Sequence, residues 1–159
     1  KPKALLKIDL PENSNHIYTD EKVRFLYSKS SDVSVKQNMY TIYYSQYDAR
    51  IYFSINELRD LELEIYQFEN SILIHEKKGA YISSNIIKDT NSALYGVLCY
   101  LDGNKIATSS QFFVTDSIRY FVRGGVDFSI SIRPEIEVQN FIMKQEIFKL
   151  IESLEWSDK

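Results

Sequence analysis

Residues 109–128, SSQFFVTDSIRYFVRGGVDF, are the stretch from which the predicted fold is built. Residues 111–115 and 118–122 are rich in aromatic and β-branched side chains, which fit a pleated, half-buried surface. Each is therefore predicted to be a strand. Between them, Thr115, Asp116 and Ser117 carry side-chain oxygens that can bond the backbone of a turn. We expect an antiparallel hairpin that reverses at these three residues.

Two glycines interrupt the second strand of this hairpin, where Arg123-Gly124-Gly125 precedes a return of the apolar pattern. Glycine inside a strand indicates a bulge or a close approach of another backbone. The structural interpretation is a bulge that lets the sheet curl under a helix. The functional alternative is a polar recognition patch for a partner, formed by Asp116, Ser117 and Arg123 on the turn or an exposed edge.

Length and composition indicate one globular domain. The 159 residues are 44% hydrophobic and 26% charged, which leaves a normal core and a solvated exterior. Aromatic residues make up 14%, including 12 tyrosines and 9 phenylalanines, and favour a large antiparallel sheet. The net charge is −3 and the basic residues are scattered, so we expect no nucleic-acid partner.

Further strands are predicted on both sides of the hairpin. Alternating patterns occupy residues 23–28, 39–45 and 50–55, and the last two are joined by a turn at residues 46–49. Residues 80–87, 93–101 and 105–110 are the next three, with a strong turn signal at residues 102–104. Together with the hairpin, these predict an antiparallel meander over residues 80–128.

Two helices complete the predicted fold. The first follows a good N-cap, Asn56, and runs for about 22 residues, or roughly 33 Å, to a stop at Gly79. Its apolar stripe consists of Leu58, Leu61, Ile65, Phe68, Ile72 and His75. The second begins around Pro134 and ends near Trp156, with one stripe made of Ile136, Met143, Ile147, Leu150, Ile151 and Leu154.

These elements predict the α+β class, with a single, mostly antiparallel β-sheet packed by two long helices. This arrangement resembles the α/β/α sandwich of the PsbP-like fold. The C-terminal helix carries a second apolar group nearly opposite its first stripe: Val138, Phe141, Ile142 and Phe148. Either the N-terminal arm or a strand extension covers this group, or it is a docking surface for a partner.

No catalytic or metal-binding pattern is present in the sequence. It has no glycine-rich phosphate loop, no GxSxG turn and no paired His or Cys ligands, so we expect no enzyme, no cofactor and no metal. A carboxylate pair stays possible, because such residues meet in space without a fixed spacing. His75 lies at a favourable helix end, and Cys99 is predicted to be a small buried hydrophobe.

Several of these segments resemble the gliding motility lipoprotein family called GldD. The likeness lies in residues 111–117, QFFVTDS, and 120–128, YFVRGGVDF, and extends to the proline-bracketed start at residues 1–11 and to the Leu-Ile-Glu and Glu-Trp of residues 150–156. Two places depart from the family pattern. Asn38-Met39-Tyr40 stands where a Cys-Trp pair is frequent, and Gly125-Val126-Asp127 replaces Ala-Leu-Tyr.

The resemblance implies a non-catalytic, lipid-anchored, periplasm-facing domain of the cell envelope. It would act through contacts with other envelope proteins in gliding motility and in the associated type IX secretion machinery. Residues 1–22 would be an extended, tether-proximal arm and residues 23–159 the single domain. The chain starts at Lys1 without a Met, so we expect a mature or trimmed form whose precursor carries a signal peptide and an anchor cysteine. No apolar run approaches the ~20 residues that span a bilayer.

The expected architecture also leaves a second function open, namely ligand binding. A PsbP-like domain could serve as a periplasmic module that binds a small ligand or an ion. Likeness of fold alone does not establish such a function.

Overall fold

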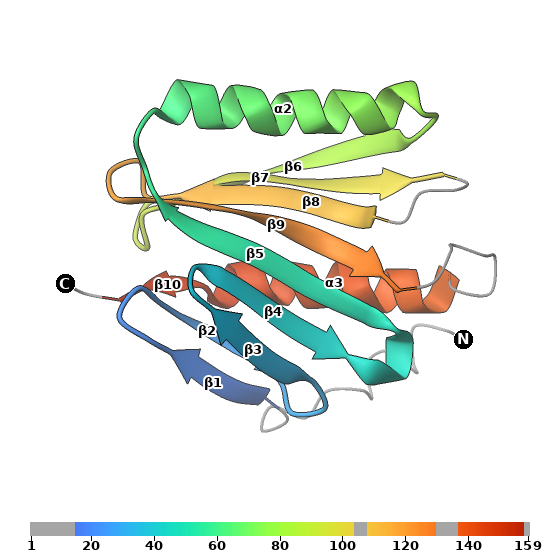
Figure 1. Cartoon of the computed structure of the whole chain (residues 1–159), viewed down its shortest axis with the longest axis horizontal. Helices are drawn as coiled ribbons and strands as arrows, with labels where there is room; N and C mark the ends of the chain where they lie inside the picture. Colours follow the sequence, from blue (N-terminus) through green and yellow to red (C-terminus); the bar gives the residue numbers. More distant parts are fainter. Residues whose placement is uncertain (1–14, 104–107, 130–136, 158–159) are drawn as a thin grey trace.

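The structure is a computed structural model, and it describes residues 15–103, 108–129 and 137–157 (Figure 1). Within these residues, ten strands and two α-helices follow one another. They are β1 (Asn15–Thr19), β2 (Val23–Ser28), β3 (Asp32–Lys36), β4 (Met39–Tyr44), a 3₁₀ turn η2 (Ser45–Tyr47), β5 (Ala49–Glu57), α2 (Leu61–Lys77), β6 (Tyr81–Asp89), β7 (Leu94–Asp102), β8 (Thr108–Thr115), β9 (Tyr120–Phe128), α3 (Glu137–Ser153) and β10 (Glu155–Trp156).

The main sheet has seven strands in the order β3-β4-β5-β9-β8-β7-β6, and all neighbours are antiparallel. The predicted hairpin is confirmed: β8 pairs with β9, and Thr115 lies opposite Phe121. The predicted meander is also confirmed, because β6, β7, β8 and β9 are consecutive neighbours. The hairpin therefore lies near the middle of the sheet.

Helix α2 packs on one face of this sheet, while α3 and a smaller sheet pack on the other (Figure 1). Under α2, Phe68 meets Phe113 of β8, with ring centroids 5.1 Å apart. On the α3 side, Phe53 and Phe112 pack with Met143 and Ile147. Burial of these side chains is the dominant favourable term that holds the layers together.

The predicted fold class is wrong. Strands hold 51% of the described residues and helices 28%, and there are two sheets, of three and seven strands, with two short helices of 17 residues each. The second sheet has the order β1-β2-β10. It was missed because β1 is short and polar and β10 has two residues, so neither produces a periodic pattern. A single-sheet PsbP-like sandwich therefore does not describe this chain.

Helix α2 begins later than predicted. Asn56 and Glu57 belong to β5, where they pair with Phe121 and Tyr120 of β9. The N-cap is Asp60, whose carboxylate accepts a hydrogen bond from the Leu63 backbone N–H at 3.2 Å. Pairing with a neighbouring strand thus overrode the local capping preference of Asn56.

Helix α3 buries the predicted stripe, because Met143, Ile147, Leu150 and Ile151 are all buried against the sheets. The helix ends at Ser153, however, and the Glu155–Trp156 segment pairs with β2 instead of continuing the helix. The predicted start at Pro134 and Ile136 lies outside the described residues, as do the last residue of the predicted turn, 104, and the first three residues of the predicted strand, 105–107.

The glycines of the hairpin do not form the predicted bulge. Gly124 and Gly125 pair in continuous register with Phe53 and Tyr52 of β5 and with Phe112 and Gln111 of β8. The one register shift in the β8–β9 pairing lies in β8, between Thr108 and Ser110. The alternative explanation for glycine within a strand therefore applies: Gly124 and Gly125 allow the backbones of neighbouring strands to approach closely.

The N-terminal arm predicted for residues 1–22 is described only from residue 15 onward, where β1 pairs with β2. Neither α2 nor α3 has the length and the apolar character needed to cross a bilayer, and this statement covers the described residues alone.

Candidate functional site

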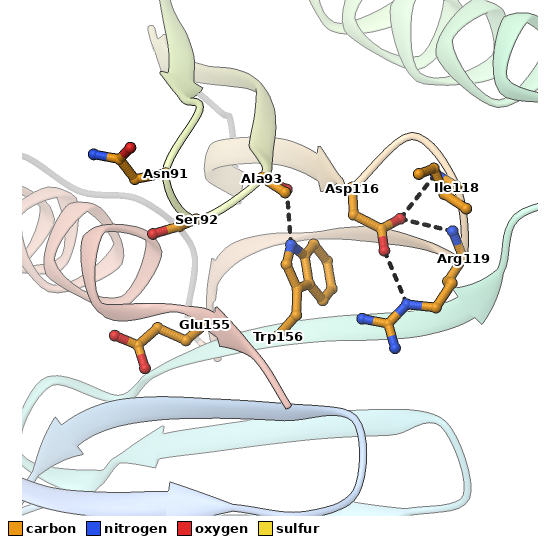
Figure 2. Close-up of a pocket in the computed structure, with 8 residues that line it drawn as sticks. All are labelled: Asn91, Ser92, Ala93, Asp116, Ile118, Arg119, Glu155 and Trp156. Atoms are coloured by element: carbon orange, nitrogen blue, oxygen red, sulfur yellow. Dashed lines mark hydrogen bonds and ion pairs between the residues drawn. The ribbon is translucent and has the colours of Figure 1, made fainter. Parts of the chain in front are cut away.

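A groove of about 660 Å³ lies at the end of the main sheet where the β8–β9 turn, the β6–β7 turn and β10 meet. Figure 2 shows its lining side chains. They are Asn91, Ser92, Ala93, Asp116, Ile118, Arg119, Glu155 and Trp156. Three segments far apart in the sequence therefore build one surface, and we call it the turn groove.

The β8–β9 turn is organised by the carboxylate of Asp116. Its Oδ1 atom accepts hydrogen bonds from the backbone N–H groups of Ile118, Arg119 and Tyr120, at 3.0, 2.8 and 3.1 Å. Its Oδ2 atom accepts a further bond from Nε of Arg119, at 3.2 Å. Ser117 completes the turn with a φ of 69°, in the left-handed region. Of the three residues predicted to form the turn, Asp116 therefore contributes most of the hydrogen bonds that stabilise it.

The environment of Asp116 keeps its carboxylate charged. Burial alone raises the pKa of Asp116, but the backbone donors and Arg119 outweigh it, and the pKa lies below its usual value. A carboxylate with four donors at these distances has little capacity left to accept a proton from a substrate. Asp116 is therefore a structural anion in this site.

Trp156 joins the C-terminal strand to the other two segments. Its indole Nε1 donates a hydrogen bond to the carbonyl of Ala93, at 2.8 Å (Figure 2). Its ring stacks on that of Tyr120, with centroids 6.1 Å apart. The guanidinium of Arg119 lies 5.2 Å from the same Tyr120 ring. Ala93, with a φ of 52°, holds its turn in the left-handed region. These contacts hold the three segments of the groove in fixed positions relative to one another.

The side chains that face the groove favour recognition over chemistry. Arg119 uses Nε for Asp116, and its other guanidinium N–H groups remain as donors on an exposed side chain. Ile118 is 80% exposed at the rim and offers apolar contact. Glu155 is paired with Arg24, at 3.4 Å. This combination can bind a carboxylate or carbonyl next to an apolar group, as a peptide presents them.

The structure separates the polar residues that the sequence grouped as a partner site. Asp116 lines the turn groove and Ser117 lies in the same turn, exposed. Arg123 lies within β9 beneath α2, with its guanidinium carbon 5.8 Å from the Phe68 ring centroid. Asp116 pairs with Arg119 instead of Arg123. Asp116 and Arg123 therefore lie on different elements, the β8–β9 turn and β9, and their joint use by a partner stays a prediction.

The second predicted surface lies on α3. Val138, Phe141 and Phe148 are 67%, 46% and 46% exposed, whereas Ile142 is half-buried. Phe141 and Phe148 line a shallow depression of about 370 Å³ together with Tyr100, Lys144 and Gln145. We call this the α3 shelf. Its outward orientation agrees with the second apolar stripe of the sequence, and its role as a partner site stays a prediction.

Sequence reasoning missed Arg119 and Trp156 as groove residues. Arg119 was assigned to a strand, and Trp156 was assigned to the end of a helix. The only available signal was that Trp156 is the one tryptophan of the chain, and a large amphipathic ring of this kind usually finds a hydrogen-bond partner when buried.

Cys99 and His75 are not among the residues that line the groove. Cys99 is buried, with Sγ 3.5 Å from Oγ of Ser84, and burial raises the pKa of its thiol. Burial and the nearby Lys78 lower the pKa of His75. Over the described ranges, no three His, Cys, Asp or Glu side chains converge as a metal site would require.

Replacing Asp116 by alanine is expected to lower the free energy of unfolding by about 2 kcal/mol, because three backbone N–H groups and Arg119 lose a charged acceptor. Urea unfolding at pH 7 measures the change. Asp116→Asn keeps one acceptor oxygen and should cost less. The exposed carboxylate of Asp32 provides the control, since Asp32→Ala removes no such acceptor. Equal stability of Asp116→Ala and the wild type would contradict the assigned role.

Comparison with known proteins gives one finding for almost the whole chain. The family model described as gliding motility lipoprotein GldD matches residues 1–156. A search of curated proteins found no match.

Proposed function

The chain belongs to the gliding motility lipoprotein GldD family, and from this membership we propose that it acts by contacting other envelope proteins and catalyses no reaction. Its place is the gliding apparatus and the associated type IX secretion machinery. The lipoprotein family implies a membrane-anchored location in the envelope. The finer proposal is that the anchor precedes Lys1 and that the folded domain faces the periplasm.

The observation that carries this proposal is the composition of the turn groove. Its one buried carboxylate, Asp116, is bound by four donors, whereas Ile118 and the outer N–H groups of Arg119 are presented to solvent. A catalytic site needs a group that is free to exchange a proton or to attack. A docking site needs a rigid, exposed surface with mixed apolar and charged contacts.

A photocrosslinking experiment in living cells tests the proposal. The anchored protein carries a photoreactive phenylalanine analogue in place of Ile118, or in place of Tyr66 on α2 as a matched exposed control. We expect an adduct with an envelope protein, identified by mass spectrometry, from position 118 and not from position 66. Arg119→Glu should reduce that adduct at least tenfold and slow gliding, because it removes the guanidinium donors. Absence of an adduct at position 118, or an adduct that Arg119→Glu does not change, would oppose the proposal.

Small-ligand binding is the second candidate, because the groove volume falls within the roughly 300–1,000 Å³ of ligand pockets. A thermal-shift screen with metals, sugars and peptidoglycan fragments separates the two functions. A concentration-dependent rise in melting temperature that Arg119→Glu abolishes would favour the ligand. No shift, together with the adduct at position 118, would favour protein contact.

A further inference from the structure

The sheets have four edge strands among the described residues, and β6 differs from the other three. β6 pairs with β7 in unbroken register from Tyr81 to Asp89, nine residues, and has no neighbour on its other side. The edges β1 and β3 have five residues each, and β10 has two. A long edge presents a row of unpaired backbone N–H and C=O groups that can template a further strand.

Most of the β6 edge also lacks the usual protection against pairing, since its charged residues, Lys88 and Asp89, are confined to its last two positions. It contains no proline, and its first seven residues, YISSNII, carry no charge. Within this window Ile86 is 84% exposed and Tyr81 is 79% exposed. The β3 edge, in contrast, starts with Asp32 and ends with Lys36. Exposed apolar side chains on this uncharged part of the edge indicate a surface that is covered in the working protein.

The residues of β6 indicate what covers it. The window from Tyr81 to Ile87 is symmetric about Ser84, with two apolar residues, three polar residues and two apolar residues. We propose that β6 pairs antiparallel with β6 of a second copy of this chain, about a two-fold axis at Ser84. This register opposes Ile82 to Ile86, Tyr81 to Ile87 and Ser83 to Asn85 of the other copy. Cross-strand pairs of these types stabilise a sheet.

The backbone is compatible with this register. Along a strand, the backbone N–H and C=O groups of alternate residues point to the same side. Opposed residues in this register have sequence numbers that differ by an even amount, so backbone groups that point away from β7 in one copy face backbone groups that point away from β7 in the other. The axis is perpendicular to the sheet, because opposed residues lie on the same face. The two seven-stranded sheets then form one continuous sheet with both α2 helices on the same face.

The α3 shelf supports the same contact from the other face. Tyr100 of β7 lies opposite Ser83 of β6, and Tyr100 lines the shelf with Phe141 and Phe148. The shelf therefore lies beside the edge, about one strand away from it. In the paired form the two shelves flank the joined β6 strands, which adds apolar burial to the backbone hydrogen bonds.

The pairing closes at two copies. After β6 is used, the remaining edges of the joined sheet are the two β3 strands, which are short and charged. A two-fold contact is self-complementary and consumes the same surface on both partners. This predicts a dimer and not a filament, and it is independent of the groove function proposed above.

Two double variants test the register by sedimentation equilibrium of the whole chain. Ser83 and Asn85 are both exposed and are opposed to each other across the axis. Ser83→Lys with Asn85→Lys opposes lysine to lysine twice and should raise the dimer dissociation constant at least tenfold. Ser83→Lys with Asn85→Glu opposes lysine to glutamate twice and should keep it within about threefold of the wild type.

Controls separate the interface from general effects. Ser34→Lys on the exposed β3 edge should leave the dissociation constant unchanged. Ile86→Lys alone, at a solvent-exposed site, should also give monomers. This single variant replaces a double variant whose circular dichroism spectrum shows that it does not fold. A wild-type chain that stays monomeric up to about 0.5 mM would overturn the proposal. A dimer that tolerates the two-lysine variant or Ile86→Lys would overturn it as well.

Discussion

Replacing Gly124 by alanine is expected to lower the free energy of unfolding by about 4 kcal/mol. A Cβ at this position would lie 2.0 Å from the carbonyl oxygen of Tyr52 and 2.5 Å from Cβ of Phe53. Both atoms belong to β5, the strand that pairs with β9 through these residues. The neighbour is backbone inside a continuous ladder, so a small side-chain movement cannot relieve the clash.

Urea unfolding followed by circular dichroism measures this effect. Gly79→Ala provides the contrast, since Gly79 has a φ of 101° but a methyl group added there would meet no atom within 4 Å. Its cost should come from the backbone angle alone and amount to about 1–2 kcal/mol. If Gly124→Ala costs no more than Gly79→Ala, the close approach between β9 and β5 is wrong.

Replacing Asp20 by alanine is expected to lower the free energy of unfolding by about 3 kcal/mol. Its Oδ2 atom accepts hydrogen bonds from the hydroxyls of Tyr40 and Tyr18, at 2.6 and 3.0 Å. Its Oδ1 atom accepts from the backbone N–H groups of Lys22 and Val23, at 2.8 and 3.0 Å. Tyr40 is 2% exposed, so its hydroxyl would lose a charged acceptor in a place with little access to water.

The contribution of Asp20 should depend on pH in a defined direction. Burial raises the pKa of Asp20, but the bonds from Tyr40, Val23, Lys22 and Tyr18 outweigh it and hold the pKa below its usual value. A lowered pKa means that the stabilisation is complete above the unfolded value of about 4 and is lost as the pH falls through the folded value. The difference between wild type and Asp20→Ala should therefore be larger at pH 7 than near pH 2.

The same cluster defines an alkaline limit. Burial and the bond to Asp20 raise the pKa of Tyr18 to about 12, so its neutral form stabilises the fold below pH 10 and this contribution is lost as the pH rises toward 12. Unfolding in urea at several pH values measures both limbs. Asp32→Ala, at an exposed carboxylate of β3, serves as the control. If the wild type and Asp20→Ala differ in free energy of unfolding by the same amount at pH 2 and at pH 7, the proposed ionic role of Asp20 is contradicted.

The main sheet was predictable because its strands carry strong local patterns. The strand patterns of residues 39–45 and 50–55, and the turn residues at 115–117, lead to the observed β4, β5 and β8–β9 turn. The second sheet was not predictable in this way. β10 consists of Glu155 and Trp156 alone, and these two residues become a strand only because β2 lies beside them. Helical periodicity up to Leu154 pointed to the wrong state for them.

The candidate site was predictable only in part. Asp116 was found because an aspartate after a strand is a turn former. Its bonding partner was not found, because Arg119 was assigned to a strand, whereas the turn brings Arg119 to the carboxylate. Trp156 reaches Ala93 from 63 residues away, a distance along the chain that no local pattern encodes. A site built from three separate segments depends on how the folded chain brings them together.

The amino-acid sequence by itself determined the antiparallel meander, the buried stripes of both helices and the family to which the chain belongs, since these follow from local periodicity and from contiguous motifs. Only the tertiary structure decided that β1, β2 and β10 form a second sheet, that Gly124 is required by a neighbouring carbonyl, and that β6 is an edge strand among the described residues. The physical reason is that a strand is completed by hydrogen bonds to another segment, so its existence, its end and its exposed side depend on which segment lies beside it.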